Sequence, residues 1–112
     1  MFEYDINKVS EELHIRTEIL NRLVHSFANT LSQKIITLEE AVTKNDIITM
    51  RAILHEIRGT SGNLRLESVL AATKIMHEAV KAEKDSGSIP GHFKVLKEKS
   101  DEFKNYIESQ AG

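Results

Sequence analysis

The sequence contains no cysteine, so neither a disulfide framework nor thiolate chemistry can contribute to its fold or function. It has no tryptophan, one proline (Pro90) and five glycines, and aromatic residues make up only 5% of it. No apolar run approaches the roughly 20 residues that a membrane-spanning helix needs. The opening residues, MFEYDINKVS, lack the basic start and apolar run of a signal peptide. We therefore expect a protein of a reducing, cytoplasmic compartment that makes no direct membrane contact.

The chain also lacks a large excess of charge of either sign. It has 15 Lys and Arg residues and 17 Asp and Glu residues, and its formal net charge is -2. No basic stripe stands out, which argues against nucleic acid as a partner. The chain has 112 residues, of which 40% are hydrophobic and 29% charged. This is the size and balance of one globular domain, and we expect residues 1–112 to form a single domain.

What the sequence does contain is apolar residues at the three- and four-residue spacing of helices. A short opening helix is predicted from Phe2, Ile6, Val9 and Leu13. A second helix is predicted over 17–43, with Thr17 as its cap and Glu18 in its first turn. Its expected buried stripe is Leu20, Leu23, Phe27, Leu31, Ile35, Leu38 and Val42.

Three further helices follow. Asp46 is the expected cap of the third, whose apolar face is Ile47, Met50, Ile53, Leu54, Ile57, Ser61 and Leu64. A fourth begins near Leu66 and buries Val69, Leu70, Thr73, Met76 and Val80. A loop over 84–91 precedes a fifth, with Pro90 in its first turn and Phe93, Leu96, Phe103, Tyr106 and Ile107 inside. The pattern predicts an all-α fold, an up-down antiparallel four-helix bundle with an additional short N-terminal helix as a lid on one end.

The segment ILHEIRGTSGNL, residues 53–64, places a histidine, an arginine and two glycines inside the third predicted helix. At about 100° per residue, His55 lies roughly 150° from the centre of the apolar stripe and is expected to face water. Six residues within about 60° of it complete what we call the His55 face. They are Ile48, Arg51, Ala52, Arg58, Gly59 and Gly62.

Glycine inside a helix costs about 1 kcal/mol relative to alanine. The apolar spacing continues through Ile57, Ser61 and Leu64, so we expect the helix to continue past Gly59. Singly, a surface histidine or a glycine near a helix end is better explained by structure. Together they leave room beside an imidazole for a bulky group on the ring and for the close approach of another protein.

The motif HEIRGTSGNL resembles that of the histidine-containing phosphotransfer (HPt) domains of multistep two-component phosphorelays. In that family a histidine on an exposed face of a four-helix bundle is followed by an aliphatic residue, lysine, glycine and small residues. The matching residues here are His55, Ile57, Arg58, Gly59, Thr60 and Ser61, and Asn63 and Leu64 also fit. The similarity extends over nearly the whole chain, including the stretches ILNRLVHSFANTLSQKIITLEEAV and KNDIITMRAILHEIRG.

The resemblance implies a phosphorelay intermediate, in which His55 accepts a phosphoryl group from a receiver-domain phospho-aspartate and passes it to another receiver aspartate. An exposed histidine is largely neutral near pH 7, so a ring nitrogen can act as the nucleophile. Arg58 would stabilise the phosphoryl group, and Gly59 would give access to it. The implied partner contacts are Ile48, Arg51, Ala52 and Gly62.

The implied partners are response-regulator receiver domains and a hybrid sensor histidine kinase, in whose cytoplasmic part such a domain can also reside. The receiver would carry the Mg²⁺, and this domain would bind no cofactor of its own and act as a monomer. Because a Gly-rich phosphate loop is lacking, we expect no autonomous kinase activity and do not expect an enzyme in that sense.

Two positions depart from the family pattern. Arg65 stands where a glycine is usual, so we expect the turn into the fourth helix to differ. His77 stands where Glu or Gln is common, with Lys81 one turn further on. His77 and Lys81 could lie against His55, and His77 could then hydrogen-bond to the phosphoryl group or to His55. Packing at the core boundary is the interpretation of His77 that we favour.

Two other classes of protein share the helical pattern. A metal-binding bundle would need inward-facing Glu-x-x-His sets, and the five histidines (His14, His25, His55, His77 and His92) are scattered without them. A helical adaptor that binds partners without carrying phosphate is the stronger alternative. It explains an exposed Ile48 but leaves the combination of His55, Arg58 and Gly59 unexplained.

Overall fold

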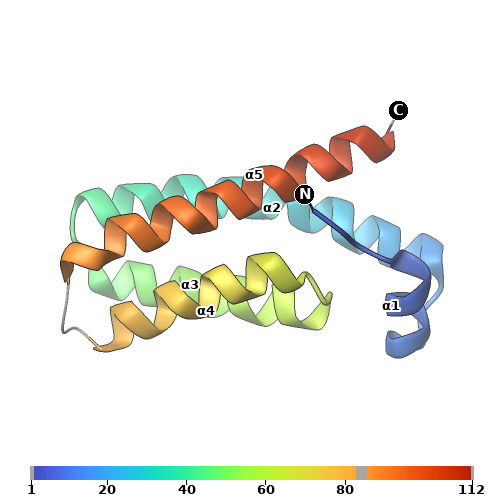
Figure 1. Ribbon diagram of the computed structural model, residues 1–112, viewed down its shortest axis with the longest axis horizontal. Helices are drawn as coiled ribbons and strands as arrows, with labels where there is room; N and C mark the ends of the chain where they lie inside the picture. Colours follow the sequence, from blue (N-terminus) through green and yellow to red (C-terminus); the bar gives the residue numbers. More distant parts are fainter. Residues whose placement is uncertain (1, 83–85, 112) are drawn as a thin grey trace.

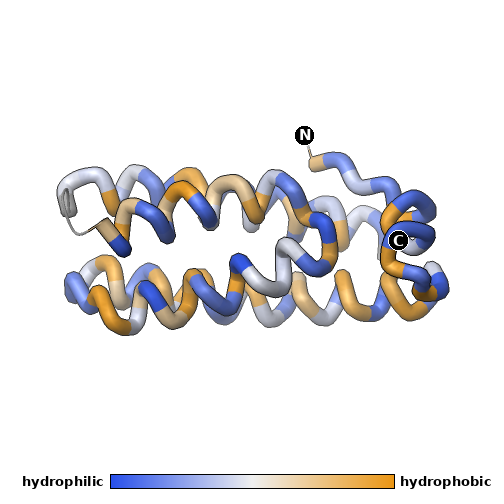
Figure 2. Tube along the Cα trace, turned by 90° about the horizontal axis from the view of Figure 1, so that it is seen from below, coloured by the Kyte–Doolittle hydropathy of each residue, from blue (hydrophilic) through white to orange (hydrophobic). Residues whose placement is uncertain are grey.

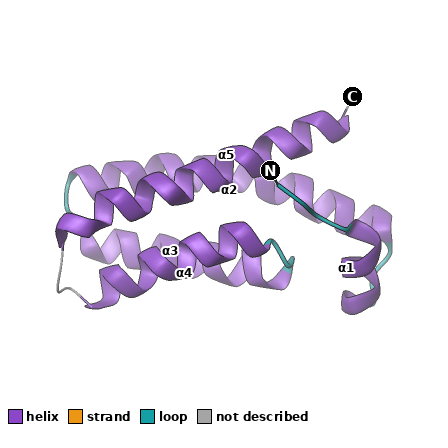
Figure 3. Cartoon of the chain, in the orientation of Figure 1, coloured by secondary structure: helices purple, strands orange, loops and turns teal. Residues whose placement is uncertain are grey.

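The computed structural model describes residues 2–82 and 86–111. None of these residues forms a strand, and helices joined by short connections account for the fold (Figure 3). The prediction of an all-α protein is therefore confirmed. The elements are α1 (Ile6–Leu13), α2 (Thr17–Thr43), α3 (Ile47–Asn63), α4 (Glu67–Ala82), the 3₁₀ turn η1 (Ser86–Ser88) and α5 (Ile89–Ala111). Over the described ranges, every helix is too short or too polar to cross a membrane.

The four longer helices pack in a closed cycle, α2 on α3, α3 on α4, α4 on α5 and α5 on α2 (Figure 1). Hydrophobic and hydrophilic residues alternate along each of them (Figure 2), and the hydrophobic ones meet in one continuous core. Burial of these stripes stabilises helices that would be marginal alone. The largest fully buried side chains include Leu20, Leu31, Leu38, Met50, Leu54, Ile57, Met76, Leu96 and Phe103.

The bounds of α2 match the predicted range. The helix is unbroken over this range because it contains neither glycine nor proline. The predicted cap is wrong. Arg16 occupies the N-cap position without a side-chain cap bond, and Thr17 Oγ1 donates instead to the Glu18 carboxylate at 3.2 Å. Glu18 does lie in the first turn, where a negative charge is favourable.

Leu23 is a second correction on α2. We predicted it in the buried stripe, but it is 47% exposed and Val24 is buried in its place. On a helical wheel Leu23 lies about 75° from the centre of the side chains that are buried, so it falls at the edge of the face. Ile19, one turn earlier, is 44% exposed on the same edge.

Phe2 lies outside the opening helix, contrary to the prediction. α1 begins at Ile6 because the Asp5 carboxylate caps it, accepting the Lys8 N–H at 3.1 Å. Phe2 is nevertheless buried in the extended segment before the cap, with its ring centroid 5.2 Å from that of Phe103. The apolar residue was identified correctly, but its spacing was not that of a helix.

The N-terminal segment and α1 lie at one end of the four longer helices, beside the turn between α3 and α4 (Figure 1). The Tyr4 hydroxyl donates to the carbonyl oxygen of Leu64 at 2.7 Å. Glu12 on α1 pairs with Arg65 at 3.5 Å. These two contacts attach the beginning of the chain to the end of α3.

The start of α3 agrees with the prediction for Asp46. Its carboxylate accepts the backbone N–H of Thr49 at 3.1 Å and the Thr49 hydroxyl at 2.6 Å, and these bonds lower the pKa of Asp46. Asn45, with a φ of 54°, makes the turn before it. α3 then continues to Asn63, past both of its glycines, as the apolar spacing indicated.

The loop predicted over 84–91 is only partly comparable with the structure. Lys84 and Asp85 lie outside the described residues, and Ser86–Ser88 form η1. Pro90 is the second residue of α5, so it lies in the first turn as predicted. A proline is tolerated there because the N–H it lacks has no partner within the helix.

Candidate functional site

The inner side of α3 determines which way the rest of the helix points. Met50, Leu54 and Ile57 are at most 1% exposed and anchor the helix in the core. Ser61 is also buried, and its hydroxyl donates to the carbonyl oxygen of Ile57 at 2.6 Å, so its polar atom is satisfied within the helix. Any rotation of α3 would expose these side chains, and its opposite side is therefore held toward solvent.

His55 lies on that opposite side and is exposed, as the helical wheel predicted. Ile48 is 82% exposed, which is unusual for a large aliphatic side chain. Of the remaining members of the His55 face, Arg51, Ala52 and Gly59 are exposed and Arg58 and Gly62 are half-buried. The structure thus brings the predicted site residues of α3 together on one accessible face.

An ion pair borders this face on the α2 side. Lys34 of α2 donates to the carboxylate of Glu56, the residue next to His55. The hydrogen bond and the charge of Lys34 lower the pKa of Glu56. The nearest carboxylate in sequence to His55 is therefore already paired with a cation.

A second network borders the face on the α4 side. Arg58 Nη1 lies 3.3 Å from Nδ1 of His77 and donates to Glu78 Oε1 at 3.1 Å. The hydrogen bond from Arg58, followed by the charge of Lys81, lowers the pKa of Glu78. Arg58 is thus drawn toward α4 by one neutral and one charged acceptor.

His77 is both a boundary packing residue and a neighbour of His55. It is only 7% exposed, in agreement with the packing interpretation, and its ring centroid lies 6.5 Å from that of His55 in an edge-on arrangement. Burial, and then the positive charges of Lys81 and Arg58, lower the pKa of His77 and favour its neutral form. A guanidinium group can only donate hydrogen bonds. Nδ1 of His77 must therefore accept from Arg58, and the ring proton is assigned to Nε2.

Neither glycine of the His55 face is required by packing within the chain. A Cβ atom built on Gly59 would meet nothing within 4 Å, and one built on Gly62 would make ordinary contact with Leu70 at 3.8 Å. Each glycine still destabilises the helix by about 1 kcal/mol relative to alanine. The open space at Gly59 lies outside the protein, beside the exposed imidazole.

Arg65 makes the turn after α3 in a glycine-like conformation. Its φ is 59°, in the left-handed region that glycine adopts at little cost. Its guanidinium Nη1 donates to the carbonyl oxygens of Gly62 and Asn63, at 3.1 and 3.3 Å. These bonds satisfy carbonyl groups at the helix end and offset the strain, so an arginine serves where we noted that a glycine is usual.

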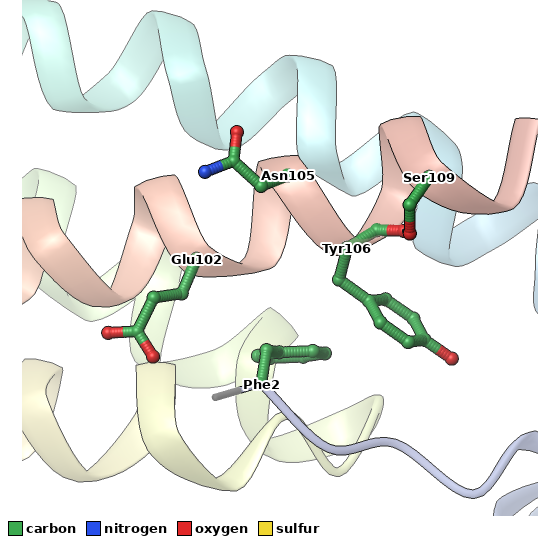
Figure 4. A pocket seen from close by; sticks show the side chains of 5 residues that line it. All are labelled: Phe2, Glu102, Asn105, Tyr106 and Ser109. Atoms are coloured by element: carbon green, nitrogen blue, oxygen red, sulfur yellow. The ribbon is translucent and has the colours of Figure 1, made fainter.

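Two cavities of at least about 410 Å³ lie away from the imidazole itself. One, of about 470 Å³, lies at the C-terminal part of α5 and contains no histidine (Figure 4); Phe2, Glu102, Asn105, Tyr106 and Ser109 line it. The other, of about 410 Å³, lies between α2 and α3 and is lined by Leu23, Ser26, Phe27, Thr30, Thr60, Asn63 and Leu64. The second includes Thr60, the residue after Gly59, but no member of the His55 face lines it.

This second cavity was not predicted, because Leu23 was expected in the core. The signal was present in the pair Ile19 and Leu23, which share one edge of the α2 stripe. Over residues 2–82 and 86–111, no group of three or more His, Asp or Glu side chains is arranged to hold a metal ion.

Comparison with known proteins gives no match to a family model, to a curated protein or to a solved structure.

Proposed function

We propose that this chain is an HPt-type phosphorelay intermediate, which takes a phosphoryl group onto His55 from a receiver phospho-aspartate and passes it to another receiver. The observation that carries the proposal is the exposed imidazole of His55 beside Gly59, where a side chain would meet nothing in the chain itself. A glycine that destabilises its helix and fills no internal need is explained by the approach of an external group.

The fold we propose is the up-down antiparallel four-helix bundle, with α1 added at one end. The closed cycle of packing from α2 to α5 supports it, as do the short connections between consecutive helices. In Figure 1 the chain colours run in alternate directions from one of these helices to the next. Such a scaffold presents α3 as a rigid, exposed surface rather than as a cleft.

The proposed step is an in-line displacement at phosphorus. A ring nitrogen of His55 attacks, the bond between phosphorus and the receiver's aspartate oxygen breaks, and the carboxylate leaves. Mg²⁺ held by the receiver would supply charge neutralisation during the transfer. This chain contributes the nucleophile, its position and one nearby guanidinium, with no cofactor of its own and no kinase activity.

Arg58 is the residue of this chain best placed to oppose the phosphoryl charge. It lies three residues after His55 on the helix, and it donates to His77, whose ring is 6.5 Å from the His55 ring. Arg51 lies one turn before His55 on the same exposed face and adds a second positive charge. Lys81, exposed in the last turn of α4, adds a third.

The proposed docking surface surrounds the imidazole. Ile48 and Ala52 provide exposed apolar contact before it on α3, and Gly62 allows close approach after it. The cavity that includes Leu23 would add a contact on α2. An apolar centre with charged residues around it suits a transient complex with a receiver domain, with this chain acting as a monomer in the cytoplasm or in a hybrid kinase.

The test is incubation with a phosphorylated receiver domain and Mg²⁺, followed by intact mass measurement. We expect a gain of one phosphate in the natural chain and in His92→Gln, a control on α5, and no gain in His55→Gln. All three proteins should show the same helicity. Labelling retained by His55→Gln would move the acceptor elsewhere, and absence of labelling with binding intact would favour the phosphate-independent adaptor.

A further inference from the structure

Arg58 is already occupied in the unphosphorylated chain. Its Nη1 atom makes both contacts with α4, to His77 Nδ1 at 3.3 Å and to Glu78 Oε1 at 3.1 Å. The Arg58 side chain is 34% exposed and that of Glu78 is 62% exposed, so the pair lies at the surface. The positive charge that borders the His55 face on the α4 side is therefore paired with a carboxylate on the neighbouring helix.

His77 and Glu78 differ in how they hold this arginine. His77 is buried and neutral, so it can keep one N–H of Arg58 without changing the charge. Glu78 is exposed and ionised, so a group with more negative charge can displace it. A phosphoryl group on His55 carries more negative charge than a carboxylate. It would also lie close to Arg58, because Arg58 contacts His77 and the His55 and His77 rings are only 6.5 Å apart.

We propose that Glu78 competes with the phosphoryl group for Arg58, with His77 as the positioning residue, and thereby limits how long His55 stays phosphorylated. This inference rests on the proposed function in assuming that His55 carries a phosphoryl group. In the resting chain Arg58 pairs with Glu78; in the phosphorylated chain it stays against His77 and turns its charge to the phosphoryl oxygens.

The consequence concerns the hydrolysis of phosphohistidine. Water attacks phosphorus, the bond between phosphorus and the His55 nitrogen breaks, and inorganic phosphate leaves the neutral imidazole. In a loose transition state the departing phosphoryl group carries less charge on its oxygens than the bound dianion does. A guanidinium on those oxygens therefore stabilises phosphohistidine more than the transition state and slows hydrolysis.

In the experiment, His55 is phosphorylated with phosphoramidate in the absence of any receiver domain. Phosphoramidate transfers its phosphoryl group to the imidazole and releases ammonia. Loss of the phosphohistidine signal is then followed by phosphorus NMR at constant pH, with His55→Gln identifying the signal. We expect Glu78→Gln to slow hydrolysis about threefold, the scale of an exposed ion pair, and Arg58→Met to accelerate it.

Glu56→Gln is the matched control. It removes the same charge beside His55, but its partner is Lys34 and the contact between Arg58 and Glu78 stays intact. An equal effect of the two glutamine variants would overturn the proposal, since general charge would then explain both. The double variant Arg58→Met/Glu78→Gln gives a second test. If Glu78→Gln still slows hydrolysis when Arg58 is replaced by Met, the proposal is overturned, because the effect would not act through the arginine.

His77 has its own control. His77→Gln keeps an acceptor for Arg58 and should preserve the natural hydrolysis rate, whereas His77→Leu should accelerate hydrolysis; equal rates in the two variants would remove His77 from the proposal. Labelling by phosphoramidate without labelling by phosphorylated receivers would overturn the relay function and still leave the Glu78 comparison measurable. A chain that takes no phosphoryl group on His55 from either donor would overturn both.

Discussion

The two sides of α3 belong to the same helix and meet different requirements. On the inner side, Met50, Leu54 and Ile57 are at most 1% exposed, and packing accounts for each of them. On the outer side, Ile48 is 82% exposed and the site of a Gly59 side chain would be empty, so packing accounts for neither. The difference separates the residues that hold the helix in place from those available to a partner.

The largest expected effect is on the inner side. Leu54→Ala should lower the free energy of unfolding by about 2–5 kcal/mol, because it removes a side chain that is 0% exposed and leaves a cavity. His55→Gln should change it by less than about 0.5 kcal/mol, as is usual for exposed positions. Denaturant unfolding of both variants measures this contrast, and similar losses would contradict the division into two sides.

Gly59→Leu is expected to have opposite effects on stability and transfer. The helix should gain about 1 kcal/mol, since the new side chain meets nothing in the chain and leucine favours helices. Transfer from a receiver should fall about a hundredfold, because the side chain fills the space beside the imidazole and misplaces the donor. Thermal melts and rapid-quench transfer assays measure the two quantities. Gly59→Ala is the graded control, and an unchanged transfer rate in Gly59→Leu would reduce the glycine to an accident of sequence.

Ile48→Asp should weaken receiver binding by about 1 kcal/mol, roughly fivefold, with stability unchanged. Ile75→Asp, on α4, is the matched control, since Ile75 is 56% exposed and lies outside the His55 face. Titration calorimetry with a receiver domain distinguishes the two. Equal weakening by both variants would show that the proposed docking surface is misplaced.

The smallest expected effect is the change in stability on protonation of His77. The pKa of His77 is lowered in the folded chain, chiefly by burial, with Lys81, Arg58 and His55 acting in the same direction and Glu78 opposing. The unfolded chain therefore binds a proton more readily, and the stability that His77 contributes above about pH 6.5 is lost as pH falls below it. Unfolding free energies between about pH 5 and 7.5 should show this slope in the natural chain and less of it in His77→Gln. An identical slope in both would assign it to other groups.

Local patterns predicted much of this structure. The 17–43 range of α2, the cap at Asp46 and the exposure of His55 depend on periodicity and capping within a few residues, and all three are confirmed. Phe2 was misassigned because an apolar residue in an extended segment happened to have helical spacing. Leu23 was misassigned because the edge of a stripe is decided by where the neighbouring helix ends.

The network at the edge of the site could not have been predicted from such patterns. Arg58 meets His77 and Glu78 across 19 and 20 residues of sequence, so the contact depends on how α3 and α4 pack. The left-handed conformation of Arg65 could not be predicted either, because positive φ values are typical of glycine and uncommon for arginine. The sequence indicated which helix carries the imidazole, and only the packing revealed what surrounds it.

The hydrogen bond from Tyr4 to Leu64 has a consequence for slow motions of α3. Fraying of the last helical turn, which contains Gly62, requires this bond to open and the segment before α1 to detach. Amide hydrogens near Gly59 and Gly62 should therefore exchange with deuterium at a rate tied to that of α1. The glycine-containing end of α3 should thus owe its protection to Tyr4, which lies 60 positions before the carbonyl group that it bonds.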